Sequence, residues 1–426
     1  MSGTALLGKS FMIPKRLVWE AYQKVRANKG AAGVDGQSLA QFEQDQKNHL
    51  YRIWNRMSSG SYFPPPVKAV QIPKAAGGVR TLGVPTVADR IAQTVVAMWL
   101  EPGVEKIFHP DSYGYRPGRS ALDAVDTCRQ RCWQHAWVID MDIKAFFDTV
   151  PHDLILKAVR KHTDQPWVLL YVTRWLQAPI QQPDGRLETR DRGTPQGSAI
   201  SPLLANLFMH YAFDAWMARE YPQIGYERYC DDVVVHCRTE QQAQRVKQAI
   251  ADRLDSLGMQ LHPDKTKIVY CPTEARPTER NGDVIEFTFL GYTFRRRKVR
   301  TRDGRIRTNF VPAISKQAAK AIGATMRSWR LGRWTTLSLE QIAEMINPIV
   351  AGWINYYGRF YKSAVIHLLA RINRYLEKWA RRKYKRLRQA PAETRRRLAR
   401  IASSHRGIFT HWRHGALPAG ATTGAV

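Results

Sequence analysis

The sequence is poor in cysteine, short of acidic side chains and without a long apolar run. Its five cysteines form no Cys-x-x-Cys pair, which excludes a disulfide scaffold and fits a reducing compartment. The longest apolar runs, such as residues 167–172, fall far short of the roughly 18–20 residues that a membrane span needs. The first residues lack the basic and apolar regions of a signal peptide, so we expect a cytoplasmic protein.

The charge is strongly positive and unevenly distributed. The 426 residues include 66 Lys+Arg against 36 Asp+Glu, a net charge of +30. Residues 295–426 hold 30 of these basic residues and 5 acidic ones, whereas residues 1–294 hold 36 and 31. Such a charge requires a polyanionic partner, with nucleic acid favoured over acidic lipid. The asymmetry predicts a catalytic body joined to a module that binds the polyanion.

The basic third has the periodicity of folded helices. Apolar residues recur every three or four positions over residues 339–353 and 365–379. A solvated helix face is the ordinary place for charged residues, but a face of one sign repels itself unless an anion lies against it. We therefore predict RNA contacts from Arg371, Arg374, Lys378, Arg381, Arg382, Lys385 and Arg386. Residues 416–426, small and uncharged, are expected to form a disordered tail.

Strand and helix patterns follow one another irregularly in the rest of the chain. Strands are predicted at residues 67–73, 79–85, 136–143, 224–229, 233–237 and 287–294. Helices are predicted within residues 12–60, from about 87, within 151–178 and 198–219, and over 241–257. This mixed order predicts an α+β fold and argues against a doubly wound sheet.

Two of the predicted strands carry acids where core residues are expected. Asp140 and Asp142 alternate with Ile139 and Met141, so the two acids share one face of their strand. The segment Tyr229-Cys-Asp-Asp232 places adjacent acids at a hairpin tip. Acids within β-forming sequence are costly unless protons, basic side chains or a metal neutralise them.

Several carboxylates brought together suggest divalent cations, and Mg²⁺ prefers such oxygen ligands. The reaction that fits is two-metal nucleotidyl or phosphoryl transfer, in which one ion activates a hydroxyl and the other steadies the leaving pyrophosphate. The alternative is an Asp-Asp turn without a partner, because acidic turns are common.

Several segments follow one another along the chain: residues 27–36, 72–85, 112–120, Asp142-Ile-Lys-Ala-Phe-Phe-Asp148, 193–202, Tyr229-Cys-Asp-Asp232, 257–266, Phe289-Leu-Gly-Tyr292 and 346–360. In this order they resemble group II intron-encoded reverse transcriptases with a maturase domain. The resemblance runs from about residue 27 to residue 413. One such segment is weak, whereas the ordered set is specific.

The resemblance implies a right-hand polymerase with fingers and a ferredoxin-like palm, followed by an α-helical thumb or maturase domain. The implied domains are an N-terminal extension of the fingers (1–66), fingers and palm (67–300), the thumb (301–415) and the tail (416–426). Relatives with an HNH endonuclease carry further metal ligands after the thumb. Nothing with that spacing follows Tyr361, so we expect the subgroup that lacks this domain.

The implied activity is RNA-directed DNA polymerase, with two Mg²⁺ ions, or Mn²⁺ in their place. The implied partners are group II intron RNA, an RNA template with a DNA primer, target DNA and dNTP, in splicing and retrohoming of a mobile element. Two alternatives stay open: a splicing-only maturase, and a domesticated reverse transcriptase in repair or defence. The intact set of acids argues against the first of these alternatives.

The resemblance also assigns individual residues. Asp142, Asp231 and Asp232 match the metal-binding acids, with Asp140 as the alternative on the same strand. The proposed nucleotide contacts are Lys74 and Arg80 to the triphosphate, Phe147 as a steric gate against ribonucleotides, Gln196 and Gly197 near the nucleotide and template, and Lys265 as a proton donor to pyrophosphate. Surface charge beside a turn is the alternative for Lys74 and Arg80.

One residue departs from the family pattern. The second position of the segment Tyr229-Cys-Asp-Asp232 is usually Ala, and Cys230 stands there. A small neutral side chain should still fit the turn. A thiol beside the metal ions, however, is expected to make the activity sensitive to oxidants.

Overall fold

The computed structural model describes residues 9–73, 78–276, 282–300 and 304–421. The chain divides into two compact units, one made of Met1–Ala124 and Val138–Ile268 and the other of Val125–Trp137 and Val269–Val426. Both contain helices and strands, so the predicted α+β class is confirmed. The assignment of exact fingers, palm and thumb boundaries stays a prediction.

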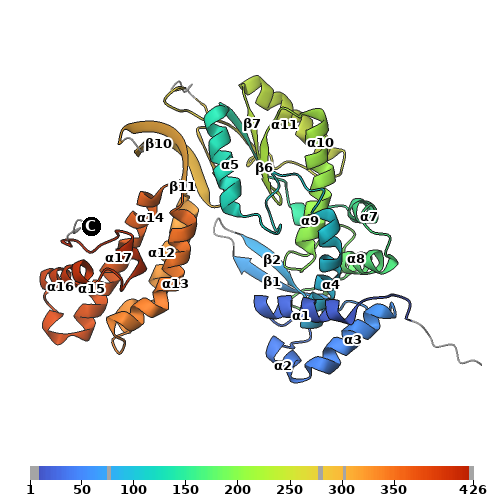
Figure 1. Ribbon diagram of the computed structural model, residues 1–426, viewed down its shortest axis with the longest axis horizontal. Helices are drawn as coiled ribbons and strands as arrows, with labels where there is room; N and C mark the ends of the chain where they lie inside the picture. The colour runs from blue at the N-terminus through green and yellow to red at the C-terminus, as the bar shows by residue number, and fades with distance from the viewer. Residues whose placement is uncertain (1–8, 74–77, 277–281, 301–303, 422–426) are drawn as a thin grey trace, which may run out of the picture. The chain divides into compact units, whose positions relative to one another are not determined.

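The first unit begins with helices that pack against one another and with a hairpin of two strands (Figure 1). The helices are α1 (Lys15–Asn28), α2 (Leu39–Gln44), α3 (Gln46–Ser58) and α4 (Val87–Val104), and the antiparallel strands are β1 (Val67–Pro73) and β2 (Val79–Val84). Helix α1 buries Val18, Ala21, Tyr22 and Val25 at helical spacing and packs against α4. Ser38 starts α2 through a capping box.

The central sheet has the strand order β6 (Tyr226–Tyr229), β7 (Asp232–Cys237), β3 (Trp137–Met141), β8 (Lys267–Tyr270). Because β3 has a neighbour on each side, it is apolar nearly throughout, and Asp140 is its half-buried exception. The other elements of the first two thirds are α5 (Ala121–Gln134), α6 (Phe146–Thr149), α7 (His152–Arg160), α8 (Pro166–Gln177), β4 (Ile180–Gln181), β5 (Leu187–Glu188), α9 (Ser201–Met209), the π-helical turn η1 (His210–Asp214), α10 (Ala215–Glu220) and α11 (Glu240–Asp255).

The second unit combines a three-stranded sheet with helices. Its elements are β9 (Glu286–Phe289), β10 (Tyr292–Arg300), β11 (Ile306–Ile314), α12 (Lys316–Ser328), η2 (Leu331–Arg333), α13 (Leu339–Tyr357), α14 (Lys362–Leu369), α15 (Arg371–Lys383), η3 (Lys385–Leu387), α16 (Pro391–Ser404) and α17 (Thr410–Arg413). The single strand predicted over residues 287–294 is wrong. Leu290 and Gly291 both have positive φ, of 50° and 79°, and form a tight turn between β9 and β10.

The helical core of the second unit extends further along the chain than expected. Asn373 is buried, accepts hydrogen bonds from the His411 and Trp412 side chains, and donates to the carbonyl of Ala416 at 3.0 Å. Ala416 is itself 2% exposed and belongs to the core. The prediction that the tail is disordered from residue 416 is therefore wrong at its start. Within the described ranges, no helix is long and apolar enough to cross a membrane.

Candidate active site

The three acids predicted to bind metal line a single cleft in the first unit, with a volume of about 840 Å³. Asp142 follows β3, and Asp231 and Asp232 lie at the turn into β7. Because β3 and β7 are neighbours in the sheet, acids about ninety residues apart in sequence come to the same place. Asp140 does not line the cleft, so the structure favours Asp142 over this alternative.

The electrostatics of the cleft favour a cation. Desolvation, followed by the charges of Asp231 and Asp142, raises the pKa of Asp232 to about 7. Desolvation and the charge of Asp232 raise the pKa of Asp140 to about 7 as well. A hard divalent ion would relieve this repulsion and suit these oxygen donors. The carboxylate oxygens of these three acids do not all lie within 4.8 Å of one another. Binding of one ion by all three would therefore require their side chains to move closer together.

The turn that carries Asp231 has only two residues. Tyr229 pairs with Asp232 across the hairpin, which leaves Cys230 and Asp231 as the turn residues. Cys230 has a φ of 61° and is 2% exposed. Burial, followed by the charge of Asp231, raises the pKa of the Cys230 thiol. A buried, protonated thiol reacts poorly, which argues against the expected sensitivity to oxidants; that sensitivity stays a prediction.

Lys265 lies directly beside the acids. Its Nζ is 3.2 Å from Oδ2 of Asp142. The segment that carries it is fixed to the end of β3, because the His262 amide donates to the Asp142 carbonyl at 2.8 Å and the Thr266 hydroxyl donates to the same carbonyl at 3.2 Å. The predicted lysine therefore reaches the cleft.

The loop after Gly193 joins the cleft to β2. The amide of Gly83 donates to the Gln196 carbonyl at 2.7 Å, and the Gln196 side chain lines the cleft. Gly197 has a φ of 110°, and a Cβ there would lie 2.6 Å from the Gly83 carbonyl oxygen. Gly197 is not among the residues that line the cleft. It allows the loop to approach β2, and its contact with the nucleotide or template stays a prediction.

The remaining candidates for nucleotide contacts are Lys74, Arg80 and Phe147. Arg80 is exposed at the cleft, whereas Lys74 lies outside the described residues. Phe147 is half-buried and lines the cleft, and Phe146 is 2% exposed and packs on Phe208. The two phenylalanines open α6 and are not strand neighbours, although one faces the cleft and the other the core as predicted.

A buried polar network beneath the turn was missed in the sequence. The Arg228 guanidinium donates to Asp214 at 2.8 and 2.5 Å, to Asn206 at 2.9 Å and to the Cys230 carbonyl at 3.0 Å. Arg228 and Asp214 are 0% and 1% exposed. Burial would lower the pKa of Arg228, but Asp214 offsets this and leaves it raised. The network holds the backbone between strand β6 and the acids at the turn.

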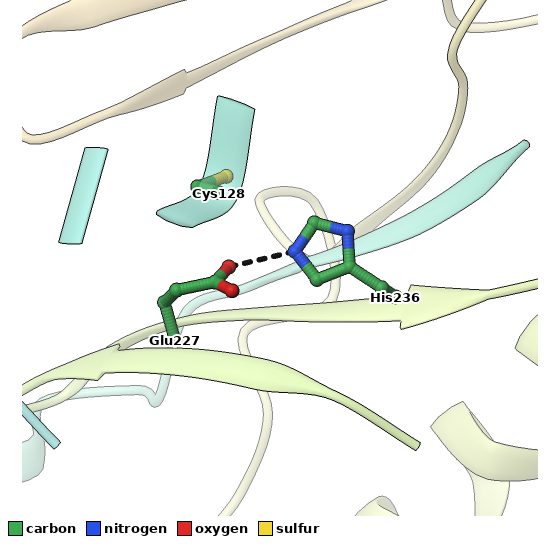
Figure 2. Close-up of side chains that lie close together, drawn as sticks. All are labelled: Cys128, Glu227 and His236. Atoms are coloured by element: carbon green, nitrogen blue, oxygen red, sulfur yellow. Dashed lines mark hydrogen bonds and ion pairs between the residues drawn. The ribbon is translucent and has the colours of Figure 1, made fainter. Parts of the chain in front are cut away.

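Two neighbouring features support the same turn. Asn206 also donates to the Gly114 carbonyl at 2.6 Å, and a Cβ at Gly114 would lie 2.6 Å from the Cys230 nitrogen. Figure 2 shows that Glu227 and His236, on the paired strands β6 and β7, form a second buried pair at 2.6 Å. Cys128, also drawn there, belongs to the second unit. The sequence signal for this buried network was the pair of charged residues, Glu227 and Arg228, within a predicted strand.

Comparison with known proteins identifies the family. The family described as reverse transcriptase (RNA-dependent DNA polymerase) matches residues 72–294, and the group II intron maturase-specific domain matches residues 319–401. The chain belongs to the reverse transcriptase family. It also carries the group II intron maturase domain. The family and the enzyme class predicted from the sequence, an RNA-directed DNA polymerase, are thereby confirmed.

Three relatives show how far the similarity extends. Protein YkfC of Escherichia coli is 30% identical over 73% of this chain and 88% of its own length. The putative COX1/OXI3 intron 1 protein of Saccharomyces cerevisiae is 24% identical over 79% of this chain and 48% of its own. The group II intron-encoded protein LtrA of Lactococcus lactis is 29% identical over 47% and 33%. The chain thus matches less than half the length of these two intron-encoded relatives.

Proposed function

We propose that the cleft extends a DNA primer on an RNA template by two-metal nucleotidyl transfer. The observation that supports this is the meeting of Asp142, Asp231 and Asp232 in one cleft with a fingers arginine and the Gly193 loop. When bound, two Mg²⁺ ions would supply activation of the primer hydroxyl and charge neutralisation at the pyrophosphate. In this proposal the three aspartates hold both ions.

The other cleft residues would orient and select the nucleotide. Arg80, with Lys74, would bind the triphosphate and offset charge that develops during transfer. The ring of Phe147 would exclude a ribose 2′-hydroxyl. Lys265 would donate a proton to the leaving pyrophosphate; it lines the same cleft, with its ammonium 3.2 Å from Oδ2 of Asp142.

The second unit would bind group II intron RNA for splicing and retrohoming. Helix α15 buries Ile372, Leu376 and Trp379 and directs most of the predicted RNA-binding side chains to solvent, while Arg381 is half-buried and donates to the Arg388 carbonyl. The intact acids disfavour a splicing-only maturase. A domesticated enzyme in repair or defence is the second candidate, and the RNA that co-purifies with the protein would distinguish it.

The proposal is tested with Asp231→Asn in primer extension on an RNA template with dNTP and Mg²⁺. We expect extension to be abolished and RNA binding to stay nearly unchanged, because the amide keeps the shape of the turn but loses the charge. Asp153→Asn, an exposed acid on α7, is the matched control and should retain full extension. Full extension by Asp231→Asn would refute the metal assignment.

A further inference from the structure

Strands β10 and β11 extend beyond the rest of their sheet. Strand β9 pairs with β10 only from Tyr292 to Arg295. Residues 296–300 then pair with residues 306–310 and, among the described residues, with no third strand. We call this two-stranded part the basic ribbon. A ribbon of two strands is marginally stable in water on its own. Strand pairing alone therefore does not explain why the chain extends into this ribbon.

The charge of the ribbon is almost entirely of one sign. Residues 295–307 contain eight basic residues and one acid, Asp303; the basic residues are Arg295, Arg296, Arg297, Lys298, Arg300, Arg302, Arg305 and Arg307. Side chains alternate between the faces of a strand. Arg296, Lys298 and Arg300 therefore share one face, and all three are exposed.

The opposite face has a structural role. Arg297 is half-buried, donates to the carbonyls of Val311 and Thr293 at 3.2 Å each, and lies 5.4 Å from the centre of the Tyr361 ring. Arg295 lies 3.9 Å from Glu286. These contacts hold the base of the ribbon. Arg296, Lys298 and Arg300, on the other face, form an exposed row, in which Arg300 also donates to the Gly304 carbonyl at 3.4 Å.

The geometry of the row matches a nucleic-acid backbone. Side chains two residues apart on a strand repeat every 6.6–6.8 Å or so, which is close to the separation of successive phosphates along one strand. Two-stranded ribbons also twist strongly, and Figure 1 shows β10 and β11 curving together as a long hairpin. A twisted row of cations follows the helical path of a duplex backbone rather than a straight line.

We propose that Arg296, Lys298 and Arg300 bind one phosphodiester backbone of a nucleic-acid duplex without reading its sequence. The row lies between the two segments that match known families, residues 72–294 and 319–401, so neither match assigns it a role. The proposal rests on the proposed polymerase function only in the choice of an RNA–DNA hybrid as the duplex.

The test compares two full-length triple variants of equal charge. Arg296→Gln/Lys298→Gln/Arg300→Gln removes the row, and Arg395→Gln/Arg396→Gln/Arg400→Gln removes three exposed charges from α16. Affinity for a labelled RNA–DNA hybrid is measured by fluorescence anisotropy over a salt series, without dNTP. We expect the first variant to bind about tenfold or more weakly, with a salt slope lower by about 2–3. The control variant should retain most of the wild-type affinity and most of the wild-type salt slope.

Two smaller variants and a second probe, single-stranded RNA, complete the test. Lys298→Gln alone should lower the salt slope by about 1, and Arg296→Lys/Arg300→Lys should bind like the wild type, which separates charge loss from misfolding. Equal effects of the two triple variants would overturn the proposal, and so would an equal loss on single-stranded RNA. Binding without dNTP does not depend on the aspartates, so failure here is distinguishable from failure of the polymerase assignment.

Discussion

The two units place their charged residues in opposite ways. In the first unit, charges are buried in pairs, as with Arg228 on β6 and Asp214 on η1, or gathered in the cleft. In the second unit, charges of one sign cover the outside of α15 and of the basic ribbon. Buried charge fixes the position of a backbone, because it is costly unless every partner is in place. Exposed charge of one sign instead attracts a polyanion.

The largest expected contrast is in stability. Arg228→Gln leaves Asp214 buried without its partner and should cost about 3–5 kcal/mol of unfolding free energy. Arg371→Gln, on the exposed face of α15, should change it by no more than about 0.5 kcal/mol. Chemical denaturation followed by circular dichroism measures both. Equal effects would remove the distinction between the two units.

A double variant separates the effect of the Arg228 network on stability from its effect on the position of the Cys230 turn. Arg228→Met/Asp214→Leu removes both charges and should recover much of the lost stability. It still leaves the Cys230 carbonyl without its donor, so we expect primer extension to stay well below that of the wild type. Restored extension in this variant would show that the network does not position the turn.

The next contrast is between two adjacent rings in the first unit. Phe147→Ala should raise incorporation of ribonucleotides relative to deoxynucleotides by roughly 10–200-fold, the range for a lost steric contact in a pocket. Phe146→Ala should leave this ratio unchanged and cost about 3–5 kcal/mol of stability, because that ring is in the core. Competition between the two nucleotide types in single-turnover extension measures the ratio. A change with Phe146→Ala alone would reverse the assignment.

The last expected contrast concerns the pH dependence of the metal-free protein. Folding raises the pKa of Asp140 and Asp232 from 3.8 to about 7. The folded state therefore binds more protons than the unfolded state between these values, and stability should fall as the pH rises from about 4 to about 7. In chelator at pH 8, Asp232→Asn should melt higher than the wild type, and the gain should vanish at pH 4. A gain of equal size at both pH values would contradict the predicted charge repulsion.

The acids could be predicted from the sequence because they break a local rule. Asp142 and the pair Asp231–Asp232 stand where strand periodicity demands core residues. The β9–β10 turn could not be predicted, since Leu290 adopts a positive φ that its side chain disfavours. The aromatic, β-forming residues from Phe287 to Phe294 indicated a single strand, although Tyr292 falls out of phase with the alternation of Phe287 and Phe289.

The partners of Arg228 were missed for a different reason. Asp214 ends the π-helical turn η1, which interrupts the helix predicted over residues 198–219 and changes which residues face the sheet. Helical spacing alone therefore places Asp214 wrongly. Likewise, Ala416 belongs to the core because its carbonyl accepts from Asn373, a long-range contact that composition does not record.

Mn²⁺ binding tests the central claim most directly. Electron paramagnetic resonance would follow a Mn²⁺ titration of the wild type, Asp142→Asn, Asp231→Asn and the control Asp153→Asn. We predict that the wild type and the control bind Mn²⁺ alike and that the two cleft variants lose most of this binding. Unchanged Mn²⁺ binding by Asp142→Asn and Asp231→Asn would contradict the assignment of these carboxylates as metal ligands.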